Sequence, residues 1–315
     1  MKKAKTKYPT GRPMRIQARP GSRAERSYYR NSVLPGAVWA MPKAIAPGIL
    51  PSPLEDLMYH GGKVVPEMEF QNVFLGSRAD WSESDATSID AAIRLAMQDR
   101  GLNNVLDQYF PGAKLACDAR PPLMLEDPKP RRITEDDVQA KVVALYDGDQ
   151  IDKRDLGTTI FNLILPSGTV LELDDSSSLS GLGGYHGSVH VRRNNRPVTL
   201  YYSANVFSER VSPTRDNGIV AFDAPWKNVV GTLYHELNEF RTDADVSDAI
   251  AQNDNDFLGW MSRQGREIGD QPIFAANPLS RVFQEVSVAS RTRVPVQFLY
   301  SNAVHGAEGP IPQPH

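Results

Sequence analysis

Two residue types that bind metal ions stand four positions apart in the segment His235-Glu236-Leu237-Asn238-Glu239. In a helix, this spacing places His235 and Glu239 about one turn apart on the same face, so an imidazole and a carboxylate can hold one ion. Glu236 then points roughly a quarter of a turn away, where its carboxylate can accept a proton. The segment therefore suits hydrolytic chemistry at a metal ion.

The helix that must carry this segment is expected to run from Asp223 to Asp245. Asp223 is a favourable N-cap, and Pro225 suits the first turn because its missing N–H costs nothing there. His235 and Glu239 project nearly opposite the apolar stripe, where an amphipathic surface helix carries solvated polar residues. An ordinary surface pair is therefore the alternative to a metal site. The stripe itself has helical spacing: Trp226, Val229, Val230, Leu233, Leu237 and Phe240.

The charge of the chain is unevenly distributed. Residues 1–30 contain ten Lys or Arg and one acid, Glu25, so this segment carries +9 and the rest of the chain −12, for a net charge of −3. Such a basic arm can contact an acidic partner or nucleic acid. A disordered, solubilising tail explains the same composition, since no folded nucleic-acid motif accompanies it.

The cysteine content and hydropathy restrict the class of protein. The single cysteine, Cys117, excludes an internal disulfide framework and a cysteine-based zinc site. No apolar run is long enough to span a bilayer, and the basic N-terminus lacks a clear apolar signal-peptide core. We therefore expect no membrane span, and a cytoplasmic location is favoured.

The order of patterns predicts three parts. Residues 1–56 are expected to be a basic, proline-rich and largely irregular arm, residues 57–303 a single α+β domain with the metal site, and residues 304–315 a mobile tail. The domain should contain a mixed sheet with helices packed on it, and the helix of His235 should line a cleft. Helices are expected at 82–100 and 134–146, and strands at 68–75, 158–165, 169–173, 184–191 and 198–207.

Four short motifs occur in an order that resembles the phosphate-induced, EXORDIUM-like family and its bacterial relatives. The resemblance covers roughly Leu57 to Asp270 and implies a zincin-like metal site. Plant members carry cysteines around the second motif and after the fourth, where this chain has none. The motifs are YHGG at 59–62, GLGGYHGS at 181–188, HELNEFRTD at 235–243 and GWMSRQGREIGD at 259–270.

A metal site needs a third ligand besides His235 and Glu239. Asp270 or Glu267, in the last motif, is the first expectation, and Asp243, two helical turns beyond His235, is the second. Zinc with three protein ligands keeps a position open for water, and a set rich in acids also suits calcium or manganese.

The remaining site residues are assigned by their chemistry. Glu236 would take a proton from the metal-bound water as general base. Tyr185 or His186, in a glycine-rich segment that allows close backbone approach, would donate a hydrogen bond to a developing oxyanion.

Two functions of different classes follow from these patterns. The first is a zinc-dependent hydrolase, most simply a metallopeptidase acting on a peptide or protein substrate. The second is a non-catalytic EXORDIUM-like binding or structural protein that uses its basic arm to dock on a partner. Glu236 would be essential for the first function and dispensable for the second.

Overall fold

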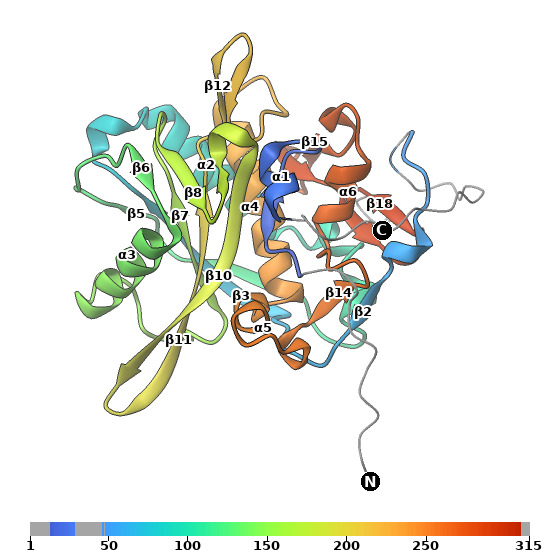
Figure 1. Ribbon diagram of the computed structural model, residues 1–315, viewed down its shortest axis with the longest axis horizontal. Coiled ribbons are helices and arrows are strands. Elements are labelled where there is room, and N and C mark those ends of the chain that lie inside the picture. The colour runs from blue at the N-terminus through green and yellow to red at the C-terminus, as the bar shows by residue number, and fades with distance from the viewer. Residues whose placement is uncertain (1–12, 29–45, 47, 310–315) are drawn as a thin grey trace.

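A seven-stranded mixed sheet forms the centre of the computed structural model, which describes residues 13–28, 46 and 48–309 (Figure 1). Its strand order is β1-β10-β11-β7-β3-β4, with β5 also paired to β3. The pairs β1–β10 and β10–β11 are antiparallel, whereas the pairs β11–β7, β7–β3, β3–β4 and β3–β5 are parallel. The strands are β1 (Ile16–Ala18), β3 (Glu67–Phe74), β4 (Ala116–Ala119), β5 (Leu123–Met124), β7 (Thr159–Ile164), β10 (Leu182–Arg193) and β11 (Arg196–Asn205).

Helices cover both faces of this sheet. α2 (Glu83–Gln98) and α4 (Pro225–Thr242) pack on one face, and α3 (Glu135–Asp147) packs on the other. Figure 1 shows α3 and α4 on opposite sides of the long β10–β11 hairpin. The two faces bury separate hydrophobic clusters, so the fold is α+β with packed helices, as the sequence predicts.

Smaller elements surround the central layers. The short helices are α1 (Arg23–Tyr28), α5 (Val246–Gln252) and α6 (Asp270–Ala275). The outer strands are β2 (Leu57–Tyr59), β6 (Arg132–Ile133), β8 (Val170–Leu173), β9 (Ser176–Ser177), β12 (Glu209–Ser212), β13 (Arg215–Asn217), β14 (Trp260–Ser262), β15 (Phe283–Ser287), β16 (Arg293–Gln297), β17 (Leu299–Ser301) and β18 (Gly306–Glu308).

Helix α4 is buried on its polar face as well as on its apolar face, which the sequence does not predict. It begins at Pro225, one position after its N-cap Ala224, and its last turn ends at Thr242. Every residue from Asn228 to Thr242 is buried, so the polar face opposite the apolar stripe is not solvated. That face packs instead against polar groups from β10 and from the loop before α6, which is why His235 and Glu239 are not a surface pair.

The N-terminal residues that the structure describes are folded onto the domain. Ile16–Ala18 forms β1 at the edge of the main sheet, and Ile16 is fully buried. Arg15 pairs with Glu135, and Arg19 with Asp216. This part of the expected arm is therefore ordered, because its apolar residues alternate with basic residues that find acidic partners on the domain. Residues 1–12 and 29–45 lie outside the described residues.

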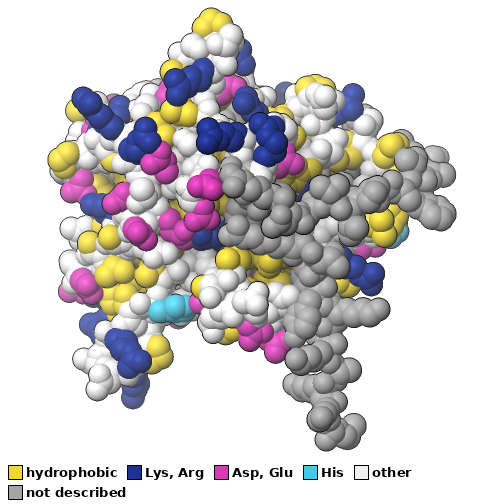
Figure 2. All heavy atoms as spheres, viewed as in Figure 1, with side chains coloured by type: hydrophobic (Ala, Val, Ile, Leu, Met, Phe, Trp, Pro, Cys, Tyr) yellow, Lys and Arg dark blue, Asp and Glu magenta, His cyan; other side chains and the backbone are white. Residues whose placement is uncertain are grey.

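The surface carries both signs of charge. On the face drawn in Figure 2, basic and acidic side chains are intermingled over the described residues. Within that same portion of the chain, no helix is long and apolar enough to cross a bilayer.

Candidate metal centre

Three segments bring histidine and carboxylate side chains together between β10 and α4. β10 contributes His186, helix α4 and its C-cap contribute four residues, and the turn at the start of α6 contributes two. All seven side chains belong to residues that are at most 1% exposed. They are His186, His235, Glu236, Glu239, Asp243, Glu267 and Asp270.

One triad joins His235, Glu239 and Asp270, whose ligand atoms lie within 4.8 Å of one another. The Nε2 atom of His235 is 2.9 Å from Oε1 of Glu239 and 4.0 Å from Oδ1 of Asp270. This is the pairing that helical spacing predicts for His235 and Glu239, with the first-choice third residue beside them.

Gln297, on β16, orients the imidazole of His235. Its Oε1 atom lies 2.8 Å from Nδ1 of His235, and its Nε2 atom donates to the carbonyl of Gly269 at 2.5 Å. Because the amide nitrogen is held by that carbonyl, the amide oxygen faces the ring and accepts the Nδ1 proton. In the neutral form of the imidazole, which is the form that binds a metal, the Nε2 lone pair then faces the acids.

A second triad joins His186, Glu239 and Glu267, also within 4.8 Å. Nε2 of His186 is 3.7 Å from Oε1 of Glu267, and Nδ1 is 3.8 Å from Oε2 of Glu239. Glu239 is therefore shared between the two triads.

Glu236 lies beside the second triad. Its Oε2 atom is 3.3 Å from Nδ1 of His186. Burial raises the pKa of Glu236 to about 8, although His235 and Arg15 oppose the shift. Burial also lowers the pKa of His186 to about 4, so this imidazole is neutral near pH 7. A carboxyl group that gains and loses its proton near neutrality is suited to general acid–base chemistry.

The acids of the cluster are difficult to ionise without a cation. Burial, reinforced by the neighbouring carboxylate of Glu239, raises the pKa of Asp270 and Glu267 well above the ordinary range. Burial opposes the charged form of His235 too, but the carboxyl groups of Glu239, Glu236 and Asp270 together outweigh it and raise the pKa of that imidazole to about 10. These pKa shifts are typical of a buried site in which the carboxylates need a cation to stay ionised.

Unsatisfied atoms test whether a metal ion fits the cluster. Oε2 of Glu239 and both carboxylate oxygens of Glu267 are buried without a hydrogen-bond partner among the described residues. Buried polar atoms are rarely left unpaired, and nitrogen and oxygen donors of this kind are metal ligands. The cluster can therefore hold a metal ion, and its donors do not identify which one.

Two glycines allow the cluster to assemble. A Cβ atom on Gly269 would lie 2.3 Å from Nδ1 of His235 and 2.9 Å from Oε1 of Glu239. A Cβ atom on Gly184 would lie 2.9 Å from Thr232 Cγ2 and 3.3 Å from Oε1 of Glu236. The glycines of two sequence motifs thus permit close approach of β10 and the α6 turn to α4.

Tyr185 is not brought into the cluster, which corrects its assignment as an oxyanion donor. Successive side chains of a strand point to opposite faces, and His186 takes the face toward α4. The ring of Tyr185 packs edge-on against Tyr202 on the α3 side, beneath the guanidinium of Arg15. The sequence motif contains both residues, but the pleat admits only one of them to the site.

Asp243 has a supporting position. Its Oδ1 atom accepts a hydrogen bond from the amide of Gly259 at 2.8 Å, and its backbone carbonyl lies 3.2 Å from Nε2 of His186. It belongs to neither triad. It ties the C-terminal end of α4 to Gly259, the residue before β14.

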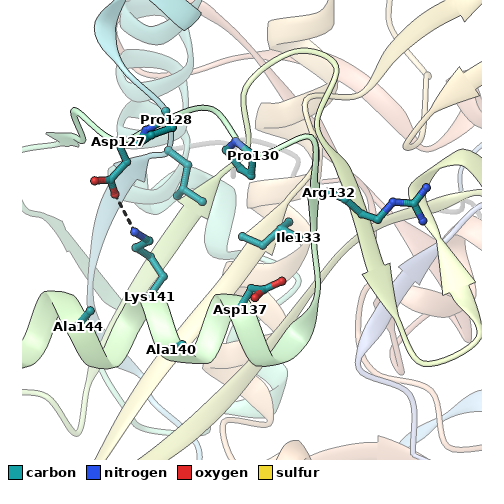
Figure 3. A pocket seen from close by; sticks show the side chains of 11 residues that line it. Asp127, Pro128, Pro130, Arg132, Ile133, Asp137, Ala140, Lys141 and Ala144 are labelled. Atoms are coloured by element: carbon teal, nitrogen blue, oxygen red, sulfur yellow. Dashed lines mark hydrogen bonds and ion pairs between the residues drawn. The ribbon is translucent and has the colours of Figure 1, made fainter.

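A surface pocket of about 390 Å³ lies on the other face of the sheet, between α3 and the proline-rich loop before it (Figure 3). The dashed line in Figure 3 joins Lys141 to Asp127, 2.7 Å apart. Asp137 caps its own helix through Thr134, and Arg132 pairs with Glu172. The charged groups of this pocket are already paired, in contrast to the buried cluster.

Comparison with known proteins assigns the chain to no family. No family model and no curated protein matches it. A distant structural match is the crystal structure of metalloproteinase-II from Bacteroides fragilis, at 11% sequence identity and a TM-score of 0.30. The match covers 68% of this chain and 53% of that one, so the chain spans about half the length of the matched structure. A likeness at this TM-score carries no weight for fold or function.

Proposed function

We propose that the protein is a metal-dependent hydrolase, with zinc as the metal and a peptide or protein as the substrate. The supporting observation is the triad of His235, Glu239 and Asp270, with Gln297 orienting His235 and with the carboxyl group of Glu236 beside His186 of the neighbouring triad. Motif resemblance to the EXORDIUM-like family agrees with a zincin-like site, and membership of that family remains a proposal.

The roles of the residues follow from their positions. His235, Glu239 and Asp270 would hold the ion, which supplies Lewis-acid activation of water. Oε1 of Glu236 has no hydrogen-bond partner among the described residues and is the atom that would accept the proton. His186 is neutral and donates its Nε2 proton to the carbonyl of Asp243, so its Nδ1 atom, 3.3 Å from the other oxygen of Glu236, would accept a hydrogen bond from that carboxyl group once it is protonated.

One observation favours the second function, a binding or structural protein. Every residue of the cluster is at most 1% exposed, and closed metal sites are typical of structural ions, whereas catalytic sites keep an open position. In that case the metal would stabilise the fold, Glu236 would be dispensable, and the basic arm would contact an acidic partner or nucleic acid.

Metal content is the first experiment. Elemental analysis should find zinc in the purified protein and lose it in the His235→Ala, Glu239→Ala double variant. His190→Ala is the matched control, because His190 also pairs with a carboxylate, that of Asp248, but lies on the exposed part of β10. An absence of metal from the unmodified protein, even after dialysis against zinc, would refute the proposal.

Hydrolysis then separates the two functions. Glu236→Gln keeps the shape of the side chain, so metal content and folding should be unchanged, while cleavage of a peptide library should fall by about 10²–10⁴-fold. Cleavage by the variant at the rate of the unmodified protein would remove Glu236 from the chemistry. No cleavage by either protein, with metal bound, would support the structural function.

A further inference from the structure

The carboxylate of Glu239 faces a different histidine with each of its oxygens. Oε1 lies 2.9 Å from Nε2 of His235 and accepts a hydrogen bond from the amide of Gly269 at 3.2 Å. Oε2 lies on the side of His186, 3.8 Å from its Nδ1 atom, and has no hydrogen-bond partner among the described residues. A carboxylate in this position can bridge two ions.

The five ligand residues fall into two groups in this arrangement. Ligand atoms bonded to one zinc ion at about 2.0–2.2 Å lie no further apart than about 4.4 Å, twice that bond length. The described residues instead form two separate triads, each with its ligand atoms within 4.8 Å, and Glu239 alone belongs to both. An ion held by His235, Glu239 and Asp270 therefore has neither His186 nor Glu267 in its own group of ligands.

A single ion at His235, Glu239 and Asp270 gives the buried carboxylate of Glu267 no partner. It is fully buried, and neither of its carboxylate oxygens has a hydrogen-bond partner among the described residues. Its Oε1 atom lies 3.7 Å from Nε2 of His186. Burying a carboxylate without a partner costs several kcal/mol, so this side chain points to a cation on its side of Glu239.

The balance of charge agrees with a second ion. Five carboxyl groups meet in the cluster, those of Glu236, Glu239, Asp243, Glu267 and Asp270, and all are at most 1% exposed. The neighbouring guanidinium of Arg15 is already held by both carboxylate oxygens of Glu135, at 2.6 and 2.7 Å. One divalent ion can compensate two ionised carboxylates, and a second ion would allow more of the five groups to ionise.

We propose that the cluster binds a pair of divalent metal ions: one at His235 and Asp270, a second at His186 and Glu267, with Glu239 bridging them. The proposal rests on the proposed function and deepens it. Two-metal sites are characteristic of enzymes that hydrolyse peptide and phosphate bonds, because two ions can stabilise both the attacking and the leaving group. His186 is then a ligand as well as a neighbour of Glu236.

Metal stoichiometry tests the pair. After dialysis against zinc, the unmodified protein should contain about two ions per chain, and Glu267→Gln about one, because only the second triad loses a ligand. Asp248→Asn is the matched control: its carboxylate is also held by a histidine, His190, but lies outside both triads, and this variant should keep both ions.

A measurement on the unmodified protein does not depend on the folding of any variant. Loaded with manganese(II), the protein should show the electron paramagnetic resonance spectrum of two spin-coupled ions, since a carboxylate bridge couples them. A single zinc per chain, or two ions with an uncoupled manganese spectrum, would overturn the pair; the former would leave the proposed hydrolase intact. An absence of bound metal would overturn both proposals.

Discussion

Replacing Gln297 by leucine should weaken metal binding without touching a ligand. The amide oxygen of Gln297 accepts the Nδ1 proton of His235 at 2.8 Å, and its nitrogen donates to the Gly269 carbonyl at 2.5 Å. Leucine has a similar volume and neither atom. The imidazole can then move its proton to Nε2, the atom that faces Glu239 and Asp270, and lose the lone pair that would bind metal.

The expected size of the effect follows from two losses. Residues that orient a metal ligand typically contribute 10–100-fold to affinity, so the dissociation constant for zinc should rise by that factor, equivalent to about 1.4–2.8 kcal/mol. The metal-free protein should also unfold more readily, by about 3–9 kcal/mol, because His235, Gly269 and Gln17 each lose a buried hydrogen-bond partner at about 1–3 kcal/mol.

Competition with a chromogenic chelator measures the dissociation constant, and urea denaturation measures the free energy of unfolding. Gln71→Leu is the matched control: Gln71 donates to the carbonyl of Pro121 at 2.9 Å, away from the cluster, so stability should fall with zinc affinity unchanged. Gln297→Glu keeps an acceptor for Nδ1 and should retain most of the affinity. Equal zinc affinity in Gln297→Leu and the unmodified protein would refute the proposed role of this amide.

Three further predictions concern the same region. Gly184→Ala should lower the free energy of unfolding by about 1–3 kcal/mol in urea denaturation, because the new Cβ would lie 2.8 Å from a backbone oxygen. Gly157→Ala is the control and should leave it unchanged, since that Cβ would lie 3.7 Å from the nearest atom. Equal effects of the two changes would contradict this reasoning. Tyr185→Phe should leave zinc affinity and peptide cleavage unchanged, since the ring lies on the α3 side; a loss of either would return Tyr185 to the site. In the protein stripped of metal by a chelator, the raised pKa of Glu236, about 8, and the raised pKa values of Glu267 and Asp270 make the folded state bind more protons than the unfolded state above pH 4.5. The raised pKa of His235, about 10, adds to this above pH 6.5, whereas the lowered pKa of His186, about 4, opposes it below pH 6.5. The free energy of unfolding should therefore fall as pH rises from 5 to 8, measured by denaturation at each pH, and zinc should remove this dependence; a rise over that window without zinc would contradict it.

Much of the fold could be predicted because local signals agree with it. Thr134 caps α3 by accepting a hydrogen bond from the amide of Asp137, as the residue types predict. β7, β10 and β11 match their expected strands to within a few residues at each end. The helix of His235 was predicted from its proline and its apolar stripe, with an end three residues too late.

The surroundings of that helix could not be predicted from its own residues. Its apolar stripe indicates one buried face, but its polar face is buried by partners more than twenty residues away in sequence. The pairing of Asp270 with His235, and of Glu267 with His186, depends on how one turn lies against α4. Gln297 gave no signal, since a glutamine at the end of a strand is ordinary until its histidine partner is known.

β1 has a consequence for how this protein associates with other molecules. It supplies the hydrogen-bonding partners for one edge of β10, through register pairs from Ile16 with Tyr185 to Ala18 with Leu182. A chain beginning after Ala18 would expose those backbone groups to water as an open sheet edge, which is a template for strands of other chains. β1 thus moves the edge of the sheet from the long strand β10 to a strand of three residues, and a shortened chain should form oligomers at lower concentration than the full chain.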